Sequence, residues 1–341
     1  MKAKTTYAVL AAVLAAGAFA ADPYNSPGPG TRYATDAYPG FDREENILPR
    51  EKKTPGFFSW WSGPKRDNPS AQLEWAEECE AAGSWGKARR AYNALVAQWP
   101  YSAEAPVAQK KLADMLLDKV FDYQEAFEEY KYLADFYSSR CDFDGTLEKM
   151  YEAARAMREE GKRILFFRFA NTTDVRRAFE AAVVRASGAK FAPEAMLTIA
   201  ALREDDGELD KAVAVYENLR NLYPRSKEAK DALLLEARTR MRILDERGYN
   251  RSRCLDTVAF LKMATAPGRY SEGRDELLAC LAVAQGMVED EDWNAAKFYD
   301  SKMRTKASAI SAYERFAGKY PASPRAEDAR ARIAELKEGA K

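Results

Sequence analysis

Carboxylates and cysteines are the residues of this chain with the clearest chemical potential, because its 341 residues include no histidine. The commonest general base, the usual metal ligand and the Ser-His-Asp and Cys-His arrangements for nucleophilic catalysis are therefore missing. Acidic clusters at 77–80 and 289–292 have the residue types of a metal or acid–base site. Consecutive residues point to different sides of a helix, however, so we expect solvated helix faces and a turn. The sequence thus predicts no catalytic site, no metal site and no cofactor.

The four cysteines form no C-x-x-C motif, and without histidine they do not suggest a zinc site. They are Cys79, Cys141, Cys254 and Cys280. If 251–264 and the segment from Ser271 onward form a helical hairpin that bends near 267–268, Cys254 and Cys280 face each other and could form a disulfide. The alternative is two separately buried thiols that act as small hydrophobic side chains.

The charge balance gives no preference for a polyanionic partner. Lys and Arg total 53 and Asp and Glu also total 53, so no net charge attracts nucleic acid or an anionic membrane. With 47% hydrophobic residues the chain can bury a large core or several small ones in series.

The N-terminal 20 residues have the pattern of a signal peptide. Basic residues at 2–4 precede an apolar run from Tyr7 to Ala20, which ends in a small-x-small site at 18–20. This run of about 14 residues is shorter than the roughly 20 that a transmembrane helix needs. The first cysteine is Cys79, so no cysteine stands at the processing point for a lipid anchor. We expect an exported and soluble mature protein.

Residues 21–67 are rich in proline and glycine and show no sustained apolar period, which predicts an extended leader. Within it, the aromatic segment 57–61 is too apolar to be left in water without a reason. It either packs on the first helices of the chain or binds a partner.

From residue 68 to 340 the pattern is helical, and one motif recurs in it. An alanine is followed four residues later by an aromatic residue, three later by a large apolar one and five later by Pro or Ser. The copies are Ala88, Tyr92, Leu95 and Pro100; Ala126, Tyr130, Leu133 and Ser138; Ala212, Tyr216, Leu219 and Pro224; and Ala309, Tyr313, Phe316 and Pro321. A weaker copy is Val175, Phe179, Ala182 and Ser187, and the segment 254–270 is a decayed sixth.

These steps place the small, aromatic and aliphatic side chains on one stripe of a helix. Proline then ends the helix, and in three copies a serine two residues later can cap the next one. Each stripe belongs to the second helix of a pair, which buries its apolar face only by stacking on neighbouring pairs. The sequence therefore predicts an all-α, helical-pair solenoid of about five to six repeats, in which the tyrosines are core residues.

These positions resemble the late signature of the tetratricopeptide repeat. The order of the repeats after a signal peptide, with Trp99-Pro100 and the closing 296–299 and Tyr320-Pro321, resembles the BamD (YfiO) family of outer-membrane assembly factors over roughly 68–337. This resemblance implies a periplasmic scaffold, possible peripheral association with the outer membrane, and two kinds of partner: unfolded outer-membrane proteins and a BamA-like barrel component. A second resemblance, to the soluble CpoB (YbgF) protein of the Tol-Pal system, implies a scaffold for envelope or cell-wall machinery.

The tetratricopeptide register also predicts which first-helix residues face a peptide-binding groove. The candidates combine apolar and charged side chains, which suits an extended peptide. They are Leu73, Glu77, Lys111, Met115, Asp118, Glu194 and Leu197.

Overall fold

A computed structural model describes residues 38–41, 63–163, 172–267, 273–302 and 305–338, and in these ranges every regular element is a helix. The expected signal peptide and the aromatic segment 57–61 lie outside the described residues. The chain divides into two compact units, Met1–Glu228 and Ala229–Lys341. Each unit is described by itself below.

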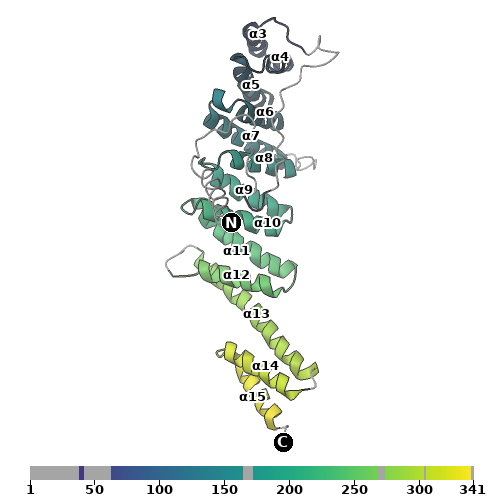
Figure 1. Ribbon diagram of the computed structural model, residues 1–341, viewed down its shortest axis with the longest axis vertical. Helices are drawn as coiled ribbons and strands as arrows, with labels where there is room; N and C mark the ends of the chain where they lie inside the picture. The colour runs from purple at the N-terminus through teal and green to yellow at the C-terminus, as the bar shows by residue number, and fades with distance from the viewer. Residues whose placement is uncertain (1–37, 42–62, 164–171, 268–272, 303–304, 339–341) are drawn as a thin grey trace, which may run out of the picture. The chain divides into compact units, whose positions relative to one another are not determined.

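The first unit is a series of antiparallel helix pairs in which each helix packs on the next (Figure 1). Its helices are α3 (Pro69–Ala81), α4 (Trp85–Gln98), α5 (Glu104–Met115) with a π-helical extension η3 (Leu116–Val120), α6 (Tyr123–Phe136) with a 3-10 turn η4 (Ser138–Arg140), α7 (Phe143–Arg163), α8 (Thr172–Arg185), α9 (Ala192–Asp205) and α10 (Leu209–Leu222).

The second unit contains nearly all of α11 (Lys227–Glu246), then α12 (Arg251–Ala264), α13 (Arg274–Lys302), α14 (Lys306–Lys319) and α15 (Pro324–Glu338). Helices α11, α12 and the first half of α13 share one apolar cluster, which includes Leu233, Val258 and Leu277. The second half of α13 shares another cluster with α14 and α15. A single helix of 29 residues therefore belongs to both clusters.

The helix ends follow from local chemistry. Asn68 caps α3 by accepting a hydrogen bond from the N–H of Ala71 at 2.8 Å, and Pro69 is the first helical residue. At the other end, Gly83 adopts φ 67° and lets Ser84 N–H donate to the Cys79 carbonyl at 2.9 Å. This is a Schellman ending, which needs a left-handed residue and so favours glycine.

The predicted serine caps are confirmed at two of the three Pro-x-Ser copies. Ser102 Oγ accepts from Ala105 N–H at 3.2 Å, and Ser323 Oγ accepts from Arg325 N–H at 3.2 Å. The end of one repeat thus begins the next.

The small, aromatic and aliphatic signature positions are core residues, as the spacing predicted, whereas Pro224 and Pro321 are exposed. The side chains of Tyr92, Tyr130, Phe179 and Tyr216 are almost fully buried, and Tyr313 is buried as well. The second helices α4, α6, α8, α10, α12 and α14 each have 14 residues. Six tetratricopeptide-type helix pairs, with α15 after the last, confirm the predicted all-α fold within the described part of the chain.

Each signature tyrosine also makes a polar contact that the spacing did not reveal. Its hydroxyl donates to a carboxylate near the end of the preceding helix. The pairs are Tyr92 with Glu80 at 2.5 Å, Tyr130 with Asp114 at 2.6 Å, Tyr216 with Glu204 at 2.8 Å and Tyr313 with Asp300 at 3.2 Å. The carboxylate and the burial of the ring both disfavour phenolate, and they raise the pKa of Tyr216, burial being the larger cause.

Helix α8 departs from this rule, because Phe179 has no hydroxyl. Charged side chains provide the buried polar contacts of this region instead. Arg203 of α9, with no exposed surface, bonds Glu180 of α8 at 2.8 Å and also pairs with Glu208. Arg176 adds a 3.2 Å contact to the same Glu180 carboxylate. We call Arg176, Glu180 and Arg203, with the partly exposed Glu208 at their edge, the buried ion cluster.

Candidate functional site

The first helices of the pairs in the first unit form one surface, which we call the first-helix face. The sequence predicts a peptide-binding groove on this face. Helices α3 and α5 pack against each other, although α4 lies between them in the chain. Lys111 Nζ lies 3.2 Å from Glu77 Oε1 across this contact, and their side chains are 42% and 40% exposed. The structure thus brings together two of the predicted groove residues on one accessible face.

A second contact between first helices joins α7 and α9. Arg158 of α7 donates to Thr198 Oγ1 of α9 at 3.3 Å. The pKa of Tyr151 is raised, mainly by burial of the ring and secondly by the nearby charge of Glu194. Tyr151 and Glu194 also share a hydrogen bond. Glu194 is exposed and Leu197 is half-buried, so these two predicted residues lie on the surface of α9.

The prediction that Met115 faces the groove is wrong. Its side chain is 1% exposed and belongs to the buried stripe of α5 that includes Ala108 and Leu112, at steps of four and three residues. Lys111 lies one residue before Leu112 and points to the surface, so the register that exposes Lys111 buries Met115. Of the other candidates, Leu73 is half-buried and Asp118, within the π-helical turn, is exposed.

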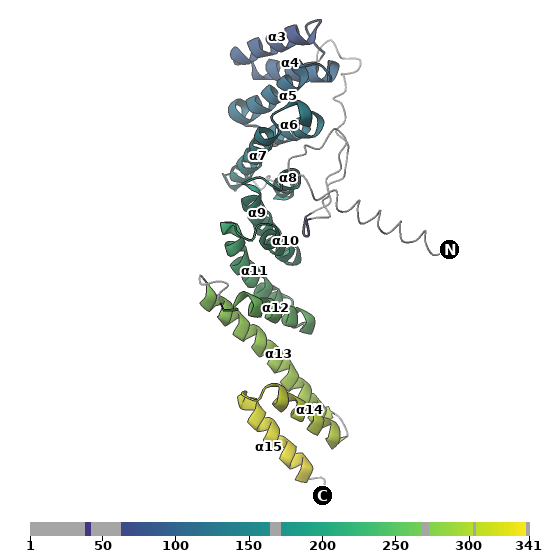
Figure 2. The same ribbon diagram turned by 60° about the vertical axis from the view of Figure 1, so that its left-hand side comes forward.

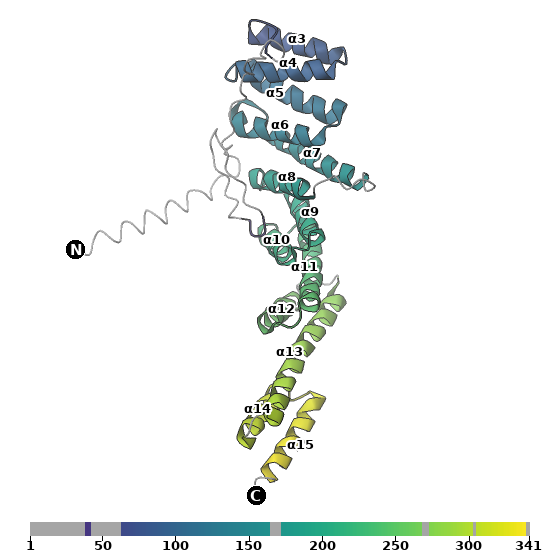
Figure 3. The same ribbon diagram turned by 90° about the vertical axis from the view of Figure 1, so that its right-hand side faces the viewer.

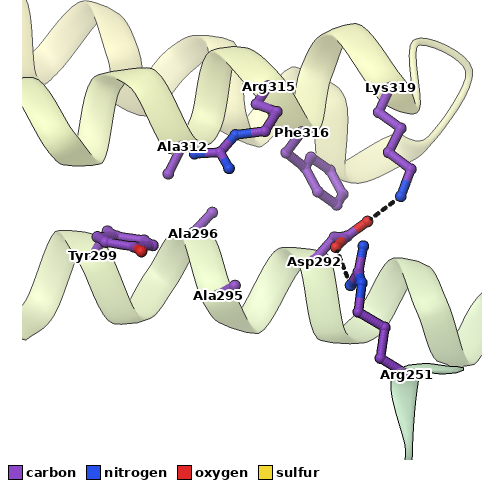
Figure 4. Close-up of a pocket in the computed structure, with 9 residues that line it drawn as sticks. All are labelled: Arg251, Asp292, Ala295, Ala296, Tyr299, Ala312, Arg315, Phe316 and Lys319. Carbon is purple, nitrogen blue, oxygen red and sulfur yellow. Dashed lines mark hydrogen bonds and ion pairs between the residues drawn. The ribbon is translucent and has the colours of Figure 1, made fainter.

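The second unit contains a small pocket between α13 and α14, with Arg251 at the start of α12 as an additional wall (Figure 4). Asp292 lies at one end of the pocket and Tyr299 at the other, both on α13. The floor is apolar and the upper wall is α14. The lining residues are Arg251, Asp292, Ala295, Ala296, Tyr299, Ala312, Arg315, Phe316 and Lys319.

Asp292 binds three donors from two parts of the unit, the start of α12 and the end of α14. Arg251 contacts Oδ1 at 2.7 Å, Lys319 contacts Oδ2 at 2.5 Å, and the Tyr320 hydroxyl donates to Oδ2 at 2.7 Å. Burial by itself would raise the pKa of Asp292, but the bonds from Lys319, Tyr320 and Arg251 outweigh it and lower the pKa to about 2. We call Asp292 and these three donors the Asp292 hub.

Arg315 is the pocket cation outside this hub, and it makes no ion pair or hydrogen bond with another described residue. The lining holds three cations and one carboxylate, so it carries an excess of two positive charges above an apolar floor. Its volume of about 140 Å³ is well below the roughly 300 Å³ at which small-molecule sites begin. Size and charge together suit a single acidic side chain of a partner protein.

The sequence interpretation of the acidic run 289–292 is corrected by this geometry. The run is not a turn, because it lies within the continuous helix α13. Two of its members bind residues at the start of α15: Glu289 accepts from Ser323 Oγ at 2.5 Å and Asp290 pairs with Arg325. No group of three or more Cys, Asp or Glu side chains in the described ranges is arranged to hold a metal ion.

Cys254 and Cys280 are both free thiols that pack in the same apolar cluster of the second unit. The helices of the predicted hairpin are present as α12 and α13, and in the structure the two thiols are not bonded to each other; Cys254 is buried and Cys280 is half-buried. Burial is the main cause that raises the pKa of both thiols, which disfavours the reactive thiolate.

No described helix combines the length and the apolar composition that crossing a membrane requires.

Comparison with known proteins finds similarity only among solved structures. No protein-family model matches the chain, and no curated protein matches it. A tetratricopeptide repeat protein from Parabacteroides merdae aligns at 12% identity and a TM-score of 0.29, over 79% of this chain and 98% of that one. The C-terminal part of a TPR repeat-containing protein from Cytophaga hutchinsonii aligns at 14% identity and a TM-score of 0.23, over 75% of this chain and 98% of that one. At these TM-scores the alignments carry no argument about function.

Proposed function

We propose that this chain is a periplasmic protein-binding scaffold that resembles BamD and aids the assembly of outer-membrane β-barrel proteins. The observation that carries the proposal is the first-helix face, where α3 and α5 pack side by side with Glu77 and Lys111 half-exposed between them. Stacked helix pairs offer extended surfaces of this kind to polypeptides. The mixture of both charges with apolar stems suits an unfolded client segment.

The pocket of the second unit supplies a separate place for a folded partner. Its cationic lining and apolar floor suit an acidic side chain, and its size limits the contact to one such residue. In this proposal an acidic residue of a BamA-like component enters the pocket, and Arg315 becomes its ion-pair partner. Export to the periplasm is supported by the signal-peptide pattern of residues 1–20.

Binding of an unfolded barrel protein tests the first-helix face. The full mature chain is mixed with a labelled outer-membrane β-barrel protein diluted from urea, and binding is followed by fluorescence anisotropy. The double variant Glu77→Lys/Lys111→Glu keeps a pair of opposite charges but reverses their positions. We expect it to weaken client binding about tenfold, because the partner now meets like charges where it met opposite ones.

The matched control is Glu314→Lys/Lys337→Glu, which reverses an ion pair of similar exposure in the second unit. We expect this variant to bind the client as the unaltered chain does. Equal binding by all three proteins would contradict the assignment of the first-helix face. In whole cells, crosslinking to a BamA-type protein and to porin-like clients supports the proposal, whereas crosslinking to TolA and wall synthases would replace it with a Tol-Pal role.

A further inference from the structure

Residues Tyr38 to Phe41 of the leader form a tight turn, which we call the leader turn. Phe41 N–H donates to the Tyr38 carbonyl at 3.1 Å, and Gly40 adopts φ 88°. Proline at the second position and a glycine with positive φ at the third are the residues that a type II turn requires. The turn brings the rings of Tyr38 and Phe41 into a stack with centroids 5.1 Å apart.

The leader turn lies directly on α10, and the short coloured segment is visible beside this helix in Figure 2 and Figure 3. A Cβ atom at Gly40 would lie 2.5 Å from the Lys211 carbonyl oxygen and 2.7 Å from Val215 Cγ2. Both distances are shorter than real contacts of a Cβ, and a helix carbonyl cannot move aside without breaking the helix. Glycine is therefore required at this position for two reasons: the turn needs a positive φ, and the close approach to α10 leaves no room for a side chain.

The tyrosine of the turn is held by a polar contact at its hydroxyl. Only 9% of Tyr38 is exposed, and it hydrogen-bonds Ser187, the residue two positions after the end of α8. Tyr223, directly after α10, donates its own hydroxyl to the Ser187 carbonyl. The contact surface is thus made by Lys211, Val215, Ser187 and Tyr223, and we call it the turn site.

We propose that the turn site is a binding site for an aromatic-Pro-Gly-aromatic turn, and that the chain occupies it with its own residues 38–41. Three features make the site selective: the Gly40 contact admits no side chain, Pro39 fixes the turn, and the Ser187 contact favours a tyrosine hydroxyl. The site lies on a second helix, apart from the first-helix face. It therefore adds a binding activity to the proposed scaffold without depending on it.

Occupancy in cis has a further consequence for the leader. The chain is held again at Lys65 and Arg66, whose N–H groups donate to Gln72 Oε1 of α3 at 2.8 and 3.1 Å. The leader is thereby tethered to the first helix pair while its turn binds the fourth. Such a tethered ligand acts at a high effective concentration, so a free peptide with the same turn competes only when the leader turn has left.

Proteolysis of the full chain tests the occupancy. In the variant Gly40→Val the added side chain meets α10 and is strained at positive φ, so the leader turn leaves its site. We expect chymotrypsin to cut the Phe41–Asp42 bond at least about tenfold faster in this variant, which corresponds to about 1.4 kcal/mol of lost docking. The control is Gly56→Val, which changes another Pro-Gly pair of the leader and leaves the rate at that bond unchanged.

Binding in trans tests the specificity of the site. The capped tetrapeptide acetyl-Tyr-Pro-Gly-Phe-amide is added to the Gly40→Val chain and to the unaltered chain, and saturation transfer to its aromatic protons is recorded by NMR. We expect a signal with the variant, whose site is empty, and a signal at least about fivefold weaker with the unaltered chain. Equal signals with both chains, none with either, or equal cutting of the Phe41–Asp42 bond would each overturn the proposal.

Discussion

The buried ion cluster of the first unit and the Asp292 hub of the second use the same chemistry in opposite ways. In each, one carboxylate binds two cations: Glu180 binds Arg176 of its own helix and Arg203 of α9, and Asp292 binds Arg251 and Lys319 of other helices. Glu180 and Arg203 are almost completely shielded from water, whereas Arg251 and Lys319 of the hub are about half exposed. A shielded cluster can only hold helices together, while a half-exposed one with Arg315 beside it can also receive a partner.

The largest effect expected from this comparison is that of Arg203→Met. Removing this cation leaves Glu180 buried with its charge only partly compensated, and should lower the free energy of unfolding by about 3–5 kcal/mol. Urea denaturation followed by circular dichroism measures it. The counterpart Arg251→Met, at an exposed ion pair, should cost about 1 kcal/mol or less. Similar losses for the two variants would remove the distinction between the clusters.

A smaller loss of stability is expected from Phe179→Tyr. This change adds a hydroxyl on α8, where the buried ion cluster stands in place of the tyrosine–carboxylate pair. Phe179 has no exposed surface, so an unsatisfied hydroxyl there should destabilise the chain by about 1–3 kcal/mol. The reverse change at a regular pair, Tyr216→Phe, should cost about 1 kcal/mol, since half-buried Glu204 regains water. A stabilised Phe179→Tyr variant would show that the cluster leaves room for a polar partner.

The Asp292 hub should make stability depend on pH at the acidic end. The pKa of Asp292 is lowered to about 2 in the folded chain, so its contribution is complete above the unfolded pKa near 4 and is lost as pH falls toward 2. Asp292→Asn should lower stability by about 1–2 kcal/mol at pH 7 and by almost nothing at pH 2. The exposed neighbour Asp290, 59% accessible in its ion pair, provides the control Asp290→Asn, with less than about 0.5 kcal/mol at either pH.

The smallest effect on folding belongs to Arg315→Ala, since this side chain has no ion pair among the described residues. Its melting temperature should equal that of the unaltered chain, while binding of the proposed BamA-type partner should fall about tenfold through loss of one desolvated ion pair. Surface plasmon resonance with the purified partner gives the comparison. Unchanged affinity would assign the pocket to the fold alone.

The spacing of small, aromatic and aliphatic residues was sufficient to predict the helix pairs. A period of four and three residues is a local property, so even the weak copy at Phe179 and the decayed one at Phe260 lie on helices with the predicted core positions buried. The prediction for Met115 was wrong because the repeat register does not give the exact rotation of α5 about its axis. The apolar stripe of α5 determines that rotation and buries Met115.

The Asp292 hub was beyond reach of the sequence for a different reason. Its donors Lys319 and Arg251 lie 27 and 41 residues away from Asp292, so only packing of three helices brings them together. Surrounded by Glu289, Asp290 and Glu291, Asp292 has the local pattern of a solvated acidic run. The leader turn was missed because Pro39-Gly40 predicts a turn but not the helix on which it lies.

The length of α13 has a consequence for how the second unit melts. In a regular array each repeat interacts only with its neighbours, and the ends can fray one pair at a time. Here Leu277 and Ala284 of α13 belong to one apolar cluster and Ala296 to the other, on one uninterrupted helix. Disorder that enters either cluster must break the helix or spread along it into the other. The two clusters are therefore coupled through one helix, and a truncation inside α13 removes the second cluster and shortens the helix that completes the first.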